Sequence, residues 1–234
     1  MATLLGALCA YIDDAYRCIS ITGSGGKTTA LIELAGYYAR QGKRVLVSTT
    51  TKLELPAHRP YGCDTYFTDD RILGYRAERA ERVFYAGVQA EKAIAPPLAH
   101  LRALMKTYDV LLLEADGARH MPLKLHTDFD PVVVDFTTTT LIVVGMSGWG
   151  QALGECCFGW NRDEQGVADD EAYLTLLHHE RGFLKGAVGK TMILCNQAEN
   201  TSEKTMHTLS GSLNTIPMFF GSLQTNTLFF RKAP

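Results

Sequence analysis

The chain has 234 residues, of which 46% are hydrophobic and 21% are charged, so it can form the full hydrophobic core of a globular domain. Its formal net charge is −2 and its basic residues are scattered, so whole-chain electrostatics give no reason to expect a nucleic-acid partner. The apolar runs are too short to cross a bilayer, and no basic region precedes the apolar segment at residues 1–10, so we expect a cytoplasmic protein that binds no membrane.

Six cysteines are spread along the chain without a Cys-x-x-Cys pair, which favours buried reduced thiols over disulfides or a zinc site. The adjacent Cys156 and Cys157 have no third cysteine near them in the sequence, and we interpret them as packing residues. No repeat, low-complexity segment or linker divides the sequence. We therefore predict one domain over residues 1–234, with an inserted hairpin region around residues 52–97.

The first predicted elements form a strand, a helix and a second strand. Residues 19–22 are predicted to be the first strand, and the β-branched residues 45–49 the second. The helix between them spans residues 27–40, and its apolar side chains recur with helical spacing at Ala30, Leu31, Leu34 and Tyr38. Such a unit predicts parallel strands joined by a right-handed crossover.

The glycine-rich segment between the first strand and the helix is the most informative feature of the sequence. Its glycines allow successive backbone N–H groups to point at one anion, and the positive end of the following helix adds to this effect. Lys27 is placed to reach the β- and γ-phosphates of a nucleotide, and the Thr28 hydroxyl is placed to ligate Mg²⁺. The predicted phosphate-binding residues are Gly23, Ser24, Gly25, Gly26, Lys27, Thr28 and Thr29.

This loop is shorter than the usual phosphate-binding pattern. That pattern has a glycine at the position where Ile21 stands, and the first glycine here is Gly23. The compact form resembles the loop of Mur-type ligases and of the deviant ATPase and GTPase groups. The loop therefore predicts phosphate binding but does not choose between these families.

The second strand ends in a run of threonines, Thr49, Thr50 and Thr51. One of these hydroxyls, with Thr50 as the candidate, could complete a Mg²⁺ shell or meet a γ-phosphate. Threonine is also a frequent strand residue, and both interpretations stay open. In the more polar region that follows, we predict a short hairpin formed near residues 66–67 and 83–85.

An apolar strand over residues 110–113, preceded by a helix over residues 98–108, places Glu114 and Asp116 just beyond its end. Carboxylates in this position are suited to holding Mg²⁺ beside a phosphate. Asp116 and Gly117 also resemble the stretch with which nucleotide switch loops sense a γ-phosphate, and an ordinary acidic turn is the alternative. Both carboxylates are candidate catalytic groups, and Asp116 is in addition a candidate metal ligand with Thr28 and Thr50.

Arg119 and Lys124 follow these carboxylates closely in the sequence. They could bind a second anionic group or stabilise the charge that develops during phosphoryl transfer, and solvated surface charge is the alternative. We take Arg119 as a candidate catalytic residue on this basis.

Residues 141–144 and 192–195 are further predicted strands, with a helix near residues 170–179 between them. The last strand is followed by Asn196-Gln197-Ala198-Glu199, which resembles the Asn-Lys-x-Asp element that reads guanine in GTPases. Asn196 and Glu199 are therefore candidate contacts to the nucleotide. Because Gln197 replaces the lysine and Glu199 the aspartate, a guanine preference stays open, and a polar loop capping the next helix is an equal alternative.

Strands that alternate with helices predict an α/β fold with a doubly wound, mainly parallel sheet in three layers, as in P-loop NTPases. Ligands of such folds bind at the carboxyl ends of the strands. Each candidate segment follows a predicted strand directly, so the predicted fold and the predicted site agree.

With these residues assembled, the chain resembles the YqeC family, accessory proteins of selenium-dependent molybdenum hydroxylases. The resemblance rests on residues 21–29, 48–52, 114–119, 122–124, 143–145 and 182–186, and on Asn196. It implies a nucleotide-dependent role in maturing a molybdenum-cofactor enzyme, with the hydroxylase or its cofactor precursor as the partner. It does not define the reaction.

These features together predict a Mg²⁺-dependent nucleoside triphosphatase that uses ATP or GTP and acts as an accessory factor in selenium or molybdenum cofactor assembly. Two alternatives stay open. One is a Mur-like ATP-dependent ligase or small-molecule kinase, and the other is a nucleotide-gated chaperone or metal-insertion factor with little turnover of its own. A homodimer is compatible with all three.

Overall fold

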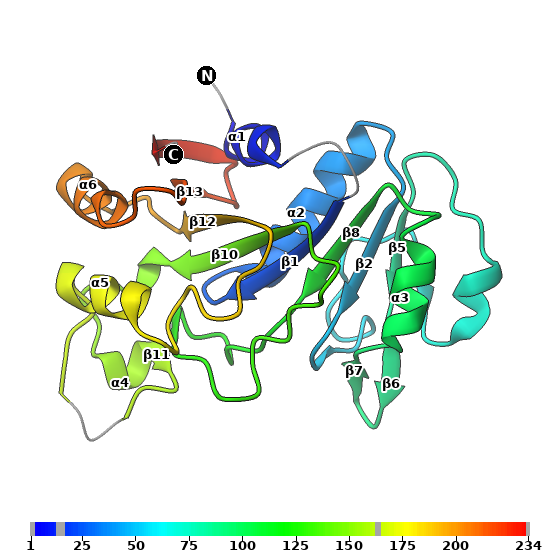
Figure 1. The fold of residues 1–234 in the computed structure, drawn as a ribbon, viewed down its shortest axis with the longest axis horizontal. Coiled ribbons are helices and arrows are strands. Elements are labelled where there is room, and N and C mark those ends of the chain that lie inside the picture. Colours follow the sequence, from blue (N-terminus) through cyan, green and yellow to red (C-terminus); the bar gives the residue numbers. More distant parts are fainter. Residues whose placement is uncertain (1–2, 13–16, 162–164, 233–234) are drawn as a thin grey trace.

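A nine-stranded sheet forms the centre of the computed structural model, which describes residues 3–12, 17–161 and 165–232 (Figure 1). The strand order is β14-β13-β12-β10-β1-β8-β2-β5-β4, and all neighbours are parallel except the antiparallel pair at the β14 edge. The strands are β1 Arg17–Gly23, β2 Val45–Thr49, β4 Thr65–Phe67, β5 Arg82–Tyr85, β8 Val110–Glu114, β10 Thr139–Gly145, β12 Lys190–Asn196, β13 Met218–Ser222 and β14 Thr227–Lys232.

Helices cover both faces of this sheet, so the fold has the three α/β/α layers predicted. Successive side chains of a strand point to opposite faces of the sheet and belong to different hydrophobic clusters. On one face, Ile19 and Ile21 pack with α1 (Leu4–Tyr11) and α2 (Lys27–Arg40). The opposite face packs against α5 (Asp170–His178) and α6 (Glu203–Gly211) at one end, and against α3 (Leu98–Leu104) at the other. Strands buried on both faces are continuous apolar runs, which is why the central ones could be read from the sequence.

The hairpin predicted within residues 52–97 is wrong in its position and pairing. Strands β4 and β5 lie where the hairpin was expected, but they pair in parallel and extend the main sheet beside β2. The connection between them includes the 3₁₀ helix η1 (Asp70–Gly74), which gives the chain the length that a parallel crossover needs. The antiparallel hairpin is formed instead by β6 (Gly87–Gln89) and β7 (Lys92–Ile94), and β3 (Leu53–Glu54) pairs with β7 to complete a small sheet.

The two described ends of the chain meet on one side of the molecule. Thr3 forms an isolated bridge with Thr227, and the Asn226 side chain accepts a hydrogen bond from Leu5 N at 2.9 Å (Figure 1). The remaining short elements are η2 (Met146–Gly148), α4 (Leu153–Cys156), and the pair formed by β9 (Leu123–Lys124) and β11 (Cys157–Phe158). Among the described residues, we find no helix with the length and apolarity needed to span a membrane.

Candidate functional site

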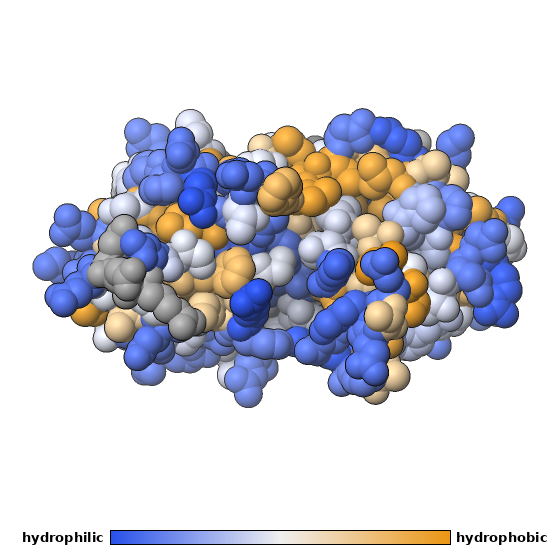
Figure 2. Space-filling model, turned by 90° about the horizontal axis from the view of Figure 1, so that it is seen from below, coloured by the Kyte–Doolittle hydropathy of each residue, from blue (hydrophilic) through white to orange (hydrophobic). Residues whose placement is uncertain are grey.

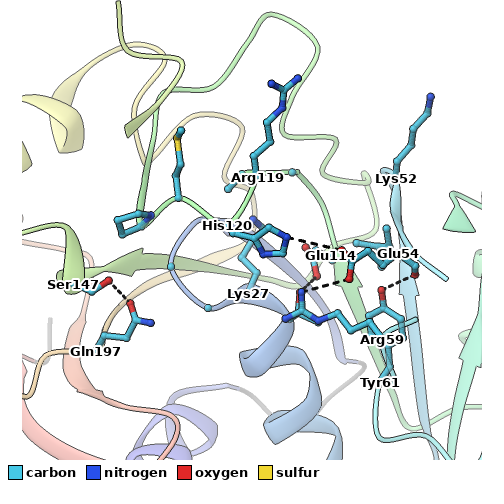
Figure 3. Close-up of a pocket in the computed structure, with 18 of the residues that line it drawn as sticks. Lys27, Lys52, Glu54, Arg59, Tyr61, Glu114, Arg119, His120, Ser147 and Gln197 are labelled. Atoms are coloured by element: carbon cyan, nitrogen blue, oxygen red, sulfur yellow. Dashed lines mark hydrogen bonds and ion pairs between the residues drawn. The ribbon is translucent and has the colours of Figure 1, made fainter. Parts of the chain in front are cut away.

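A cavity of about 470 Å³ opens at the carboxyl ends of the central strands, where ligands of such sheets bind (Figure 3). The lower face of the molecule, seen in Figure 2, is largely hydrophilic with smaller apolar areas. The residues that line the cavity come from the glycine loop, from the loop after β8, from the region after β2, and from the ends of β10 and β12. They include Gly25, Gly26, Lys27, Thr28, Lys52, Glu54, Arg59, Tyr61, Lys92, Glu114, Gly117, Arg119, His120, Ser147 and Gln197.

The glycine loop is packed directly against the end of β10. Gly25 has a φ of +75°, and a Cβ on it would lie 2.2 Å from the Cα of Gly145. A Cβ on Gly23 would lie 2.2 Å from the Val143 carbonyl oxygen. Helix α2 then begins at Lys27 with Gly26 as its N-cap, so the first amides of the helix have no capping side chain at that position and face the cavity. Glycine is thus required here both by backbone conformation and by close packing.

Lys27 connects the loop to the strand beside it. Its ammonium group donates to the Gly23 carbonyl oxygen at 2.6 Å and lies 3.1 Å from Asp116 Oδ1. The side chain is only 5% exposed, yet it forms part of the cavity wall. A charged group in this position is available to an anion that enters the loop.

Thr28 faces Glu114 across the cavity floor. The threonine hydroxyl donates to Glu114 Oε2 at 2.9 Å, and both residues line the cavity. Burial raises the pKa of Glu114, and the opposing charge of Lys27 and the Thr28 hydrogen bond only partly offset this effect. A hydroxyl and a buried carboxylate, both oxygen donors, form the kind of pair that suits a hard cation such as Mg²⁺.

Asp116 has a different environment. Its Oδ2 accepts hydrogen bonds from Gly23 N at 3.0 Å, from Lys124 Nζ at 3.2 Å and from His126 Nε2 at 2.8 Å. Burial alone would raise the pKa of Asp116, but Lys27, His126 and Lys124 together lower it to about 2. The residue is fully buried and lies outside the described lining of the cavity.

The geometry therefore distinguishes the two predicted carboxylates. Asp116 accepts three hydrogen bonds on Oδ2 and has the Lys27 ion pair, without a hydrogen bond, on Oδ1, whereas Glu114 lines the cavity beside Thr28. We assign Asp116 the positioning of the loop and of Lys27, and we favour Glu114 over Asp116 as the group that would hold a metal ion.

Lys124 and His126 are the two side chains that contact Asp116 Oδ2. Lys124 is fully buried and donates to the Gly117 carbonyl at 2.6 Å and to the Asp130 carboxylate. His126 has Nδ1 2.9 Å from the Gly182 carbonyl oxygen and Nε2 2.8 Å from Asp116 Oδ2, so both ring nitrogens have a hydrogen-bond partner. His126 was not predicted as a site residue, because a single histidine in a loop belongs to no recognisable sequence motif.

The other predicted site residues differ in whether they line the cavity. Thr50 donates to the Val132 carbonyl at 2.6 Å and lies outside the described lining. Ser24 donates to the Pro122 carbonyl at 2.8 Å and thereby supports the loop, and Thr29 lies in the first turn of α2, outside the described lining. Arg119 does line the cavity, with its guanidinium 5.4 Å from the centre of the Phe158 ring.

Asn196, the last residue of β12, contacts the glycine loop. Asn196 donates from Nδ2 to the Gly25 carbonyl at 2.9 Å and accepts from Leu223 N at 3.0 Å. Gln197 lines the cavity and accepts a hydrogen bond from Ser147 at 2.7 Å, whereas Glu199 is exposed and lies outside the described lining (Figure 3). Asn196 is therefore in place to set the shape of the loop.

A three-layer α/β fold, with a glycine loop that leads from its central strand to a Lys-Thr helix start, defines a protein of the P-loop type, an architecture that fits nucleotide binding. The model of the YqeC protein family matches residues 19–161, more than half of the chain, and the chain belongs to this family. A relative from Escherichia coli K12, described as uncharacterized protein YqeC, is 28% identical over 181 residues, which cover 71% of this chain and 70% of the relative.

Proposed function

We propose that this protein binds a nucleoside triphosphate, ATP or GTP, together with Mg²⁺ and hydrolyses it. The observation that carries the proposal is the pair formed by Thr28 and Glu114, 2.9 Å apart, at the start of the helix that follows the glycine loop. The amides at the start of α2 and the Lys27 ammonium group suit phosphate oxygens, and the Thr28–Glu114 pair suits the cation that accompanies them.

Lys27 changes partner in this mechanism. In the structure its ammonium group satisfies the Gly23 carbonyl and Asp116, which keeps it close to the loop. An entering β- or γ-phosphate offers a stronger, charged acceptor, so Lys27 turns toward it while Asp116 retains Lys124 and His126. The amides of the loop complete the phosphate contacts without a conformational change of the helix.

Thr28 and Glu114 would hold Mg²⁺, whose charge favours phosphoryl transfer when it is bound. Glu114 also lies where it can orient a water molecule toward the terminal phosphate. Arg119, at the opposite wall, is the candidate for stabilising charge on that phosphate. Thr50 and Asp116 take no direct part, because their side chains are engaged by Val132 and by the buried charge network.

The biological role we propose is that of an accessory factor in the maturation of a selenium- or molybdenum-dependent enzyme. Membership of the YqeC family supports this role through the resemblance already described. A hydrolysis rate that is slow for the protein alone and rises when the hydroxylase or its cofactor precursor is added would favour a nucleotide-gated factor.

One observation favours a ligase or kinase as the second candidate. The cavity continues past Glu114 to Lys52, Glu54 and Arg59, which leaves room for an acceptor other than water. Formation of nucleoside diphosphate only when an acceptor is supplied would support this candidate.

The test is a hydrolysis assay on Glu114→Gln. We expect the rate of phosphate release with Mg²⁺ to fall by about 100-fold or more, because a carboxylate that holds the metal is removed. Nucleotide affinity should change by less than about tenfold, since the loop and Lys27 remain. Glu171→Gln, an exposed change in the first turn of α5, is the control. A Glu114→Gln variant as active as the wild type would contradict the assignment.

A further inference from the structure

The cavity is larger than its phosphate-binding end. Figure 3 shows Ser147 and Gln197 on one side of Lys27, and Glu54, Arg59 and Tyr61 on the other. If the phosphates lie over the glycine loop, the terminal phosphate points toward Glu114 and the nucleoside lies on the Gln197 side. The Arg59 side then forms a separate compartment next to the terminal phosphate.

Basic side chains gather around this compartment. Lys52, Arg59, Lys92, Arg119 and His120 all line the cavity. They come from three separate segments of the chain, so the fold and not a local run of charge brings them together. The acidic residues of the lining are Glu54 and Glu114, and Glu114 belongs to the proposed metal site.

The described ion pairs of these basic side chains are long. Arg59 Nη1 lies 4.0 Å from Glu54 Oε2, and His120 Nε2 lies 3.9 Å from Glu54 Oε1. Arginines elsewhere have close carboxylate partners, such as Arg82 with Asp64 at 2.6 Å. Neither Lys52 nor Lys92 forms an ion pair with any residue in the described part of the chain. Their charge is therefore available to a ligand.

The compartment has a defined backbone frame. Glu54 in β3 pairs directly with Lys92 in β7, and the buried Tyr61 donates its hydroxyl proton to the Glu54 carbonyl at 2.8 Å. Tyr61 also stacks on Phe84 of β5, with ring centroids 4.7 Å apart. The inserted small sheet thus fixes the segment that bears Lys52 and Arg59 at the mouth of the site.

We propose that this compartment binds a small phosphate-bearing molecule beside the terminal phosphate of the nucleotide. The inference rests on the proposed function and names the class of its second ligand. Guanidinium and ammonium groups are suited to phosphate oxygens, and several of them are needed to offset repulsion from a neighbouring triphosphate. Because the whole cavity of about 470 Å³ also has to hold the triphosphate, the second ligand must be a small molecule.

The experiment is a calorimetric titration of the full chain saturated with Mg²⁺ and a non-hydrolysable ATP or GTP analogue. Glycerol 3-phosphate is the phosphate probe, and citrate is the carboxylate probe. We expect glycerol 3-phosphate to bind the loaded protein, and the variant carrying Lys52→Ala and Arg59→Gln to bind it at least about tenfold more weakly. The analogue should bind this variant within about threefold of wild type, and Lys106→Ala, an exposed change in the turn after α3, should alter neither affinity.

Several results would overturn the inference. Glycerol 3-phosphate that binds only the nucleotide-free protein would be occupying the glycine loop instead. An affinity unchanged in the double variant, or tighter binding of citrate, would remove the basis for a phosphate site. A protein that binds the analogue normally but neither probe would refute this inference alone, whereas failure to bind the analogue would refute the proposed function as well.

Discussion

Two carboxylates that are two residues apart illustrate how environment sets the role of a residue. Glu114 faces the cavity, and burial raises its pKa. Asp116 is surrounded by Lys27, Lys124 and His126, which lower its pKa to about 2 in spite of burial. The first arrangement leaves a carboxylate that can exchange partners, and the second creates a fixed anion that holds the side chains of Lys27, Lys124 and His126 in place.

Asp116→Asn tests the structural role of that anion. Because the substitution removes the carboxylate partner of the buried Lys27 ammonium group and one of the two carboxylates beside Lys124, we expect a loss of about 3–5 kcal/mol in the free energy of unfolding at neutral pH. Urea unfolding followed by circular dichroism measures it. Asp135→Asn, which removes an exposed pair with Arg102, should cost less than about 1 kcal/mol.

The pH dependence of the same variant gives a second measurement. A folded-state pKa below the ordinary value means that the ionised Asp116 stabilises the fold above about pH 4, and that this contribution is lost as the pH falls toward 2. The stability gap between wild type and Asp116→Asn should therefore narrow on acidification, by about 2 kcal/mol over the full window. A gap that stays constant from neutral pH down to pH 3 and below would contradict the buried ion pairs.

At the scale of elements, the conformation of the glycine loop depends on contacts with the ends of β10 and β12 as well as on the loop's own sequence. Gly145 at the end of β10 contacts Gly25, and Asn196 at the end of β12 binds the Gly25 carbonyl. Both residues lie more than a hundred positions from the loop in the sequence. The compact loop thus depends on two neighbouring parallel strands that end at the same level.

Gly145→Ala should weaken nucleotide binding although the residue lies outside the loop. A Cβ at this position would lie 2.8 Å from the Pro122 carbonyl oxygen and 2.9 Å from the Gly25 Cα, so the loop must shift. We expect a loss of affinity of about tenfold or more, measured by calorimetry. Gly211→Ala, where nothing lies within 4 Å of an added Cβ, should bind as wild type does.

The affinities of Asn196→Ala and Glu199→Ala variants for ATP and for GTP test whether either residue contacts the base. Because Asn196 supports the loop backbone, Asn196→Ala should weaken ATP and GTP by similar factors, about tenfold each. Glu199→Ala should change neither affinity, since its side chain is exposed and outside the cavity lining. Selective loss of GTP binding in either variant would restore the base-reading interpretation of this segment.

For the molecule as a whole, the sequence predicted the central strands and α2 well, because strands buried on both faces appear as unbroken apolar runs. Strands β13 and β14 were not predicted. The residues of β14 alternate between exposed and half-buried, so this strand lacks an unbroken apolar run, whereas β13 is buried along its whole length. The pairing of β4 with β5 depends on a long crossover, which local patterns do not encode. Nor did the sequence reveal the loop that carries His126 under Asp116, since this contact forms only when the chain is folded.

Part of the candidate site could also be predicted from the sequence. Lys27, Thr28 and Glu114 follow motif spacing and do line the cavity together. Lys52 belongs to the segment 48–52 that was expected at this edge of the sheet, and it lines the cavity. Arg59 and Lys92 were not expected there, because they belong to an insertion whose position relative to the main sheet is set by tertiary packing.

The central claim is that the loop and Lys27 bind the phosphates of a nucleotide with Mg²⁺. Its most direct test is the equilibrium affinity of ATP and GTP, each with Mg²⁺, for the wild type and for Lys27→Ala, with circular dichroism to confirm the fold of the variant. We predict that at least one nucleotide binds the wild type and that Lys27→Ala weakens it by about tenfold or more, because a charged phosphate contact is lost. A wild type that binds neither nucleotide, or a folded Lys27→Ala variant with unchanged affinity, would contradict the account.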